Sequence, residues 1–94
     1  MKTIHKYTLQ ITDNQDIKLP IGSDILSVQF QDDQLQLWAM VETNYNTPTA
    51  MRTRKISIIG TGHEISEEDW HRLLYISTVQ DGEFVWHVFE YIID

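Results

Sequence analysis

Apolar and polar residues alternate along much of the chain with a period of two, which is typical of a half-buried β-strand. Thr3–Ile11 alternates in this way. In Gln34–Thr43 the apolar residues stand at every second position, and the opposite face carries Trp38 among polar residues and methionine. We therefore predict two strands whose apolar faces, including Leu35, Leu37, Ala39 and Val41 of the second strand, lie in a core.

Turn-forming residues separate further strand segments. Asp16–Leu19 follows the polar cluster Thr12–Gln15, and we expect it to form a hairpin with Thr3–Ile11. Ile25–Gln31 stands before Asp32-Asp33 and Gln34–Thr43 after it, which predicts a second hairpin with a tight turn.

A third hairpin is predicted near the end of the sequence. Leu73–Gln80 and Glu83–Ile92 bracket Asp81-Gly82, a strong signal for a two-residue turn. The segment 84–89 has almost no polar side, so we expect its strand to be central or covered on both faces.

Between the second and third hairpins, Met51–Ile59 is expected to be a strand that ends in two glycines, and residues 44–50 the longest loop. Ser66 is a good helix N-cap with acidic residues after it, which predicts one or two helical turns over Ser66–Arg72. The predicted fold is mostly β, with about seven antiparallel strands and one short helix in a sandwich or small barrel. All 94 residues fit a single globular domain.

Composition narrows the class of protein. The chain has no cysteine, which excludes disulfides, thiolate zinc sites and a cysteine nucleophile. Its first residues alternate instead of forming the apolar stretch of a signal peptide, and no apolar run approaches the roughly 20 residues of a membrane helix. We expect a cytoplasmic protein with no membrane partner.

Charge argues against binding to a long nucleic acid. Fourteen acidic and seven basic residues give a net charge of −7, and such binding depends on cationic contacts to phosphates. Acids cluster at 64–69, and this surface either attracts a basic protein or only maintains solubility. Arg52-Thr53-Arg54-Lys55 is locally basic and indicates either a small anionic ligand or a solvated strand face.

Several motifs together resemble a family of small uncharacterised phage and prophage proteins, a domain of unknown function. They are Ile17–Gly22, Ile25–Gln29, Leu37–Val41, Ile58–His63, Tyr75–Gln80 and Phe84–Glu90, which span nearly the whole chain in a specific order. The resemblance implies an accessory role in the cytoplasm of a viral host and implies no chemistry. Glu64–Leu74 departs from the pattern expected of the family by being longer and more acidic.

Catalysis and metal binding find little support in the sequence. The four histidines are scattered without paired short spacing, which is typical of structural histidines, so we predict no metal site and no cofactor. The serines have no nucleophile-elbow context. We expect a protein that is not an enzyme.

One loop is a candidate for binding a ligand. Successive backbone N–H groups around glycines form anion-binding nests, although a shaped turn between strand and helix explains the same residues. Aromatic rings add stacking surfaces, with packing as their alternative role. The candidate ligand-binding residues are Arg52, Arg54, Gly60, Thr61, Gly62, His63, Trp38 and Tyr45.

Two hypotheses of function follow. The first is a counter-defence protein that sequesters a small anionic nucleotide signal by stoichiometric binding. The second is an acidic inhibitor of a basic host protein, such as a defence effector or nuclease, through Glu64, Glu67, Glu68 and Asp69. A virion or assembly component is a further alternative. A cysteine-free β domain of this size has exposed strand edges, so we also expect a homo-oligomer.

Overall fold

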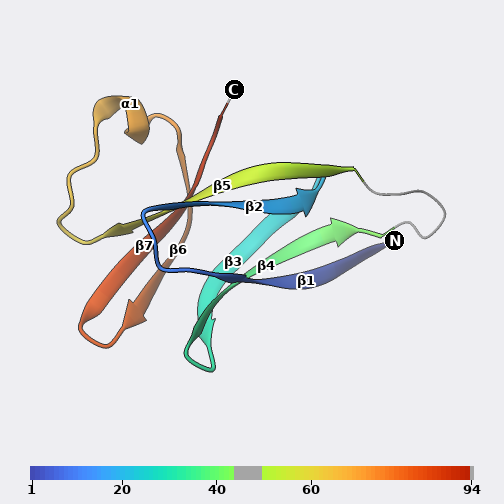
Figure 1. Cartoon of the computed structure of the whole chain (residues 1–94), viewed down its shortest axis with the longest axis horizontal. Coiled ribbons are helices and arrows are strands. Elements are labelled where there is room, and N and C mark those ends of the chain that lie inside the picture. Colours follow the sequence, from blue (N-terminus) through green and yellow to red (C-terminus); the bar gives the residue numbers. More distant parts are fainter. Residues whose placement is uncertain (44–49, 94) are drawn as a thin grey trace.

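The computed structural model describes residues 1–43 and 50–93, which form an antiparallel β fold with one short helix (Figure 1). The elements in chain order are β1 (Lys2–Leu9), β2 (Asn14–Pro20), β3 (Asp24–Gln31), β4 (Gln34–Glu42), β5 (Met51–Gly60), α1 (Glu67–Trp70), β6 (Leu73–Asp81) and β7 (Phe84–Tyr91). The predicted fold class, mostly β with about seven strands and one short helix, is confirmed. The helix is capped as expected, since the Ser66 side chain accepts a hydrogen bond from the Asp69 N–H.

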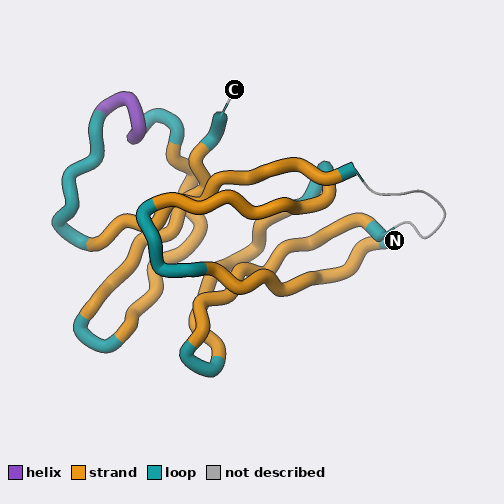
Figure 2. The backbone as a smooth tube through the Cα atoms, viewed as in Figure 1, coloured by secondary structure: helices purple, strands orange, loops and turns teal. Residues whose placement is uncertain are grey.

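The strands form two sheets, with strand orders β1-β4-β3 and β2-β5-β7-β6. Two of the predicted hairpins, β3–β4 and β6–β7, are present, and their turns project from the same side of the molecule (Figure 2). Asp32 and Asp33 have φ angles of 51° and 63°, and Gly82 has 60°. A tight hairpin turn of this hand requires positive φ, which aspartate and glycine tolerate better than other residues. The last strand, β7, is central, as predicted.

The predicted hairpin between the first two strands is wrong. β1 pairs with β4, and β2 pairs with β5, so the chain crosses from one sheet to the other between Leu9 and Asn14. The side chain of Gln15 bridges this corner: its Oε1 accepts from the Gln10 N–H at 3.0 Å, and its Nε2 donates to the Gln10 carbonyl at 2.6 Å. The polar turn signal marks a change of direction, but it does not specify the pairing partner.

The core lies between the two sheets and includes the predicted apolar face of β4. Leu35, Leu37, Ala39 and Val41 are all almost fully buried. They pack with apolar residues of the facing sheet, and burying each large side chain contributes about 1.5–3 kcal/mol. The other core residues are Leu9, Leu19, Val28, Ile56, Ile58, Val79 and Val88.

The edges of β3 and β6 approach each other without forming a backbone ladder. The Val28 N–H of β3 donates to the Ser77 Oγ of β6 at 3.0 Å. Each of these strands has a register shift beside this contact, between Ile25 and Ser27 in β3 and between Tyr75 and Ser77 in β6. A hydroxyl therefore bridges the two edges, and the fold is a sandwich, not a closed barrel.

Candidate functional site

Arg54, predicted to bind a ligand, forms an internal ion pair. Its Nε donates to Glu90 Oε2 at 2.5 Å, its Nη2 to Glu90 Oε1 at 2.7 Å, and its Nη1 to the Ser23 carbonyl at 2.8 Å. The hydrogen bond to Glu90 raises the pKa of Arg54 above its usual value. All three bonding nitrogens thus hold β5, β7 and the start of β3 together, and the guanidinium charge is already balanced.

Arg52 is exposed, but it lies far from the glycine loop. It stands near the start of β5, opposite Leu19 of β2, whereas Gly60 ends the same strand. Eight residues of extended strand span about 26 Å. A small ligand therefore does not contact both Arg52 and the loop 60–63.

The next two candidates, Trp38 and Tyr45, were predicted to stack on a ligand beside the loop 60–63. Trp38 is half-buried on the other sheet, where its neighbours in the ladder are Lys6 of β1 and Ser27 of β3. Tyr45 lies outside the described residues. Of the predicted ligand-binding residues within the described ranges, the structure brings together only Gly60, Thr61, Gly62 and His63.

The glycine loop has a structural explanation. A Cβ atom at Gly60 would lie 3.2 Å from Cζ3 of Trp86 and 3.3 Å from Cε1 of His63, so glycine permits both rings to approach the strand. Gly62 has a φ of 90°, which favours glycine.

The backbone donors of the same loop are largely engaged within the protein. The His63 N–H donates to the Gly60 carbonyl at 3.2 Å, and the Thr61 N–H donates to the Val85 carbonyl at 3.3 Å. An anion-binding nest requires free N–H groups that converge on the ligand. This geometry gives the predicted nest little support.

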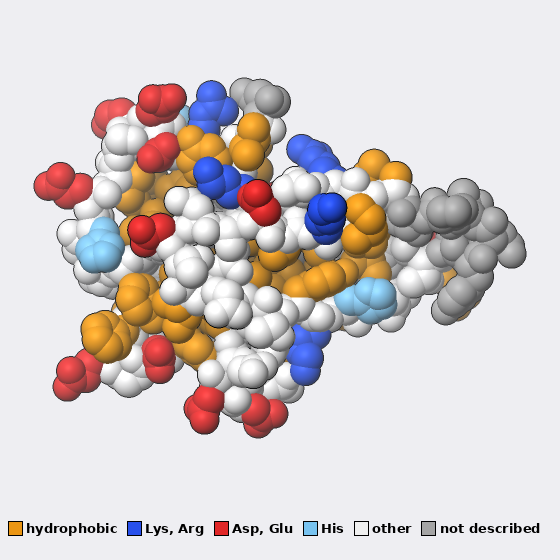
Figure 3. Space-filling view, in the orientation of Figure 1, with side chains coloured by type: hydrophobic (Ala, Val, Ile, Leu, Met, Phe, Trp, Pro, Cys, Tyr) orange, Lys and Arg blue, Asp and Glu red, His pale blue; other side chains and the backbone are white. Residues whose placement is uncertain are grey.

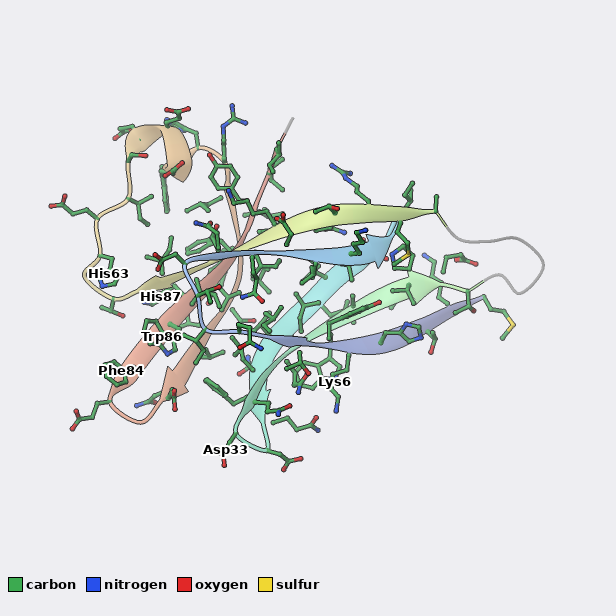
Figure 4. The ribbon with its side chains drawn as sticks, viewed as in Figure 1. Lys6, Asp33, His63, Phe84, Trp86 and His87 are labelled. Atoms are coloured by element: carbon green, nitrogen blue, oxygen red, sulfur yellow. The ribbon has the colours of Figure 1, made fainter. Side chains whose placement is uncertain are left out.

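A hydrogen-bonded chain of side chains runs from Thr61, directly after β5, across β7 to β6 (His87 is labelled in Figure 4). His87 Nε2 lies 2.7 Å from Thr61 Oγ1, and His87 Nδ1 lies 3.1 Å from Thr78 Oγ1, which lies 2.8 Å from the Tyr75 hydroxyl. Hydroxyls both donate and accept, so they suit either protonation state of the imidazole. This chain was not predicted from the sequence, although the register of the β6–β7 hairpin places Thr78 opposite His87.

A cleft of about 390 Å³ lies on the four-stranded sheet beside the segment 63–69. In it, Lys55 Nζ lies 4.8 Å from the centre of the Tyr91 ring, and the Tyr91 hydroxyl donates to Asp69 Oδ1 at 2.9 Å. That hydrogen bond raises the pKa of Tyr91. The cleft also contains Asp13 and Glu64, so its carboxylates outnumber its single lysine and disfavour a phosphate ligand.

Exposed carboxylates line one edge of the molecule. They come from the segment carrying α1, whose acids lie at the upper left of Figure 3, and from the tips of the β3–β4 and β6–β7 hairpins, whose acids lie at its lower left and bottom. We call this set the acidic rim: Asp32, Asp33, Glu64, Glu67, Glu68, Asp69, Asp81 and Glu83.

Few of the rim carboxylates have a cationic partner. Within residues 1–43 and 50–93, the ion pairs join the Met1 amine to Glu42, Arg54 to Glu90, and His71 to Glu67. The hairpin-tip carboxylates therefore have none there. Their charges are solvated and create a negative potential over this edge.

Phe84 and Trp86 form a stacked pair at the start of β7, directly after the β6–β7 turn (Figure 4). We call this pair the aromatic platform. Their ring centroids are 5.7 Å apart and their planes are inclined by 14°. Phe84 is 62% exposed, whereas Trp86 is half-buried. Trp86 packs against the core, as the almost wholly apolar segment 84–89 predicted, whereas the exposure of Phe84 was not predicted because strand periodicity does not show where two sheets diverge.

Neither a membrane span nor a metal centre is evident among the described residues. None of their helices is long and apolar enough to cross a bilayer. In the same ranges, His, Asp and Glu side chains do not gather in a group of three that could hold a metal ion.

Fold and surface together define a small domain of two antiparallel sheets with one acidic edge. The chain belongs to the family described as Domain of unknown function (DUF7352), whose model matches residues 1–93. The resemblance to a domain family of unknown function is thereby confirmed. Neither the curated proteins nor the solved structures contain a match to the chain.

Proposed function

We propose that this protein acts by stoichiometric binding to a basic protein surface through its acidic rim. The observation that carries this proposal is the gathering of exposed carboxylates on one edge, with the hairpin-tip members lacking cationic partners in the described ranges. Charges arranged in this way accelerate association with an oppositely charged surface and orient the partner before contact.

A binding role fits the shape of the rim. Its members lie on three separate connections, the β3–β4 turn, the segment around α1 and the β6–β7 turn, all of which are positioned by the rigid strands. A surface of this kind presents separated negative charges to a broad partner, and the cleft that its members Glu64 and Asp69 line is itself rich in carboxylates. The resemblance of the sequence to phage and prophage proteins supports a role as an accessory inhibitor of a host defence effector or nuclease.

Sequestration of a small nucleotide is the rival proposal, and the geometry supports it less well. Arg54 is paired with Glu90, Arg52 is about 26 Å from Gly60, and the cleft near Tyr91 is rich in carboxylates. A thermal-shift screen with cyclic dinucleotides, cyclic trinucleotides and ADP-ribose derivatives separates the two. A ligand at 100 times its Kd stabilises the fold by about 2.7 kcal/mol, so a large selective shift would favour sequestration.

The direct test is capture of binding proteins from host lysate at about 0.1 M and about 1 M NaCl, between which the Debye length falls from about 10 Å to about 3 Å. The rim variant is Glu67→Gln with Glu68→Gln. The matched control, Asp16→Asn with Asp24→Asn, removes the same charge from outside the rim.

We expect a basic protein to be captured at low salt by the wild type and by the control, with weaker capture by the rim variant. Capture that is unchanged by salt, or reduced equally in both variants, would overturn the proposal.

A further inference from the structure

The aromatic platform presents one free ring face beside the acidic rim. Phe84 is stacked on Trp86 with a centroid separation of 5.7 Å, so one side of the Phe84 ring is covered by the indole. With 62% of the residue exposed, the rest of the ring faces solvent. Aromatic residues that are exposed and held in place are typical anchors of protein interfaces.

Trp86 holds the aromatic platform in place. Trp86 lies on the central strand β7, with Gly60 and Val79 as its neighbours in the ladder, and Gly60 leaves the space that the indole occupies. Its Nε1 atom is buried and has no hydrogen-bond partner among the described residues. A buried donor without a partner costs about 1–3 kcal/mol, which offsets part of the gain from packing the indole against the core.

Carboxylates flank the exposed ring. Asp81 is directly opposite Phe84 in the β6–β7 ladder, and Glu83 precedes Phe84 in the turn. Figure 4 shows Asp33, at the tip of the other hairpin, on the same side of the molecule as Phe84. An aromatic face with neighbouring negative charges attracts a cation through two interactions, a cation–π contact with the ring and an ion pair with the carboxylates.

We propose that the exposed face of Phe84 binds an arginine side chain of the partner protein, with Asp81 and Glu83 pairing with its guanidinium. Arginine fits better than lysine because its planar, weakly hydrated guanidinium stacks on a ring while its edge donates to carboxylates. This inference rests on the proposed function, since it names the group that the acidic edge recognises.

The test uses the full chain and two probes, a short peptide of alternating glycine and arginine and its lysine counterpart. Binding is followed by ¹H–¹⁵N NMR, in which each tryptophan contributes one indole signal; Trp38→Phe and Trp70→Phe assign the signal of Trp86. The variant is Phe84→Leu, which keeps an apolar side chain but removes the ring. The control is Tyr75→Leu, a ring of similar exposure (58%) elsewhere on the sheet.

We expect the arginine peptide to shift the Trp86 indole signal and to bind more tightly than the lysine peptide. Phe84→Leu should weaken binding of the arginine peptide about three- to fivefold, which is the range expected of an exposed cation–π contact. It should also remove the preference for the arginine peptide over the lysine peptide. Tyr75→Leu should change neither quantity. Spectra that retain their dispersion confirm that both variants are folded.

The other outcomes separate this inference from the proposed function. If both peptides bind at low salt and Phe84→Leu leaves the arginine affinity unchanged, the platform is not the arginine site, while recognition of basic surfaces stands. If neither peptide binds at low salt, both proposals fall.

Discussion

Arg54 and Glu90 form a two-point ion pair between adjacent strands, and Arg54 also donates to the carbonyl of Ser23. The pair lies at the end of the core, with side-chain exposures of 17% and 9%. A basic residue on a predicted strand face is therefore part of the scaffold, where it joins β5 and β7 to the start of β3.

Removing one partner of this pair should destabilise the fold strongly. Glu90→Gln leaves the Arg54 guanidinium without its balancing charge, and because Arg54 is only partly buried we expect a loss below the about 3–5 kcal/mol of a fully buried pair. The double variant Arg54→Met with Glu90→Leu removes both charges and should recover most of that loss. Urea unfolding measures both values, and a double variant no more stable than the single one would contradict this account.

The bridge between the sheet edges should depend on one hydroxyl. Ser77→Ala leaves the buried Val28 N–H without its acceptor, and we expect a loss of about 1–3 kcal/mol in the free energy of unfolding. Ser27→Ala is the control, because its hydroxyl contacts Ser77 only at 3.5 Å. Equal losses in the two variants would show that the Val28 bond is not the important contact.

A methyl group at Gly60 should disturb the aromatic platform. Gly60→Ala places a Cβ atom against Trp86 and His63 at 3.2 and 3.3 Å, and overpacking of this kind costs about 1–3 kcal/mol. His63 is exposed and can move away from the added methyl group, whereas the indole of Trp86 cannot. Adding His63→Ala should therefore restore only part of the stability that Gly60→Ala removes. Thermal unfolding and tryptophan fluorescence report the change, and an unaltered midpoint would exclude the steric role.

Tyr91 should titrate at higher pH than an ordinary tyrosine. The hydrogen bond to Asp69 raises the pKa of its hydroxyl, so the stabilisation it gives is complete below pH about 10 and is lost as the pH rises through the folded-state pKa. Asp69→Asn should lower that pKa. The measurement is the ultraviolet absorbance of tyrosinate against pH; the same titration curve for both proteins would contradict the assignment.

Self-association stays a prediction, and the structure indicates where to test it. β1 is an edge strand of its sheet and carries Lys2 and Lys6, which oppose pairing between two copies by charge repulsion. A homo-oligomer joined at β1 should therefore be favoured by salt, whereas the proposed binding to a basic partner weakens with salt. Light scattering at micromolar concentration decides, and a monomer at every salt concentration would contradict the prediction.

Local signals in the sequence determined which segments are strands and where the helix begins. They placed the tight turns to within one residue, since Gly82 and Glu83 form the turn that was predicted at Asp81-Gly82. The alternation of Leu35, Leu37, Ala39 and Val41 predicted the buried face of β4. Asp32-Asp33 and Ser66 marked a turn and a cap. These features depend on backbone preferences and side chains within a few residues, so a single sequence displays them.

Only the tertiary structure decided which strands pair and which polar groups are already satisfied. No local pattern distinguishes β2 from β4 as the partner of β1, because ladder hydrogen bonds use the same backbone groups everywhere. Arg54 has an internal role because Glu90, 36 residues further along the chain, lies within reach of its guanidinium. Phe84 is exposed because the two hairpins separate at their tips, and burial at such a position depends on the distance between two sheets.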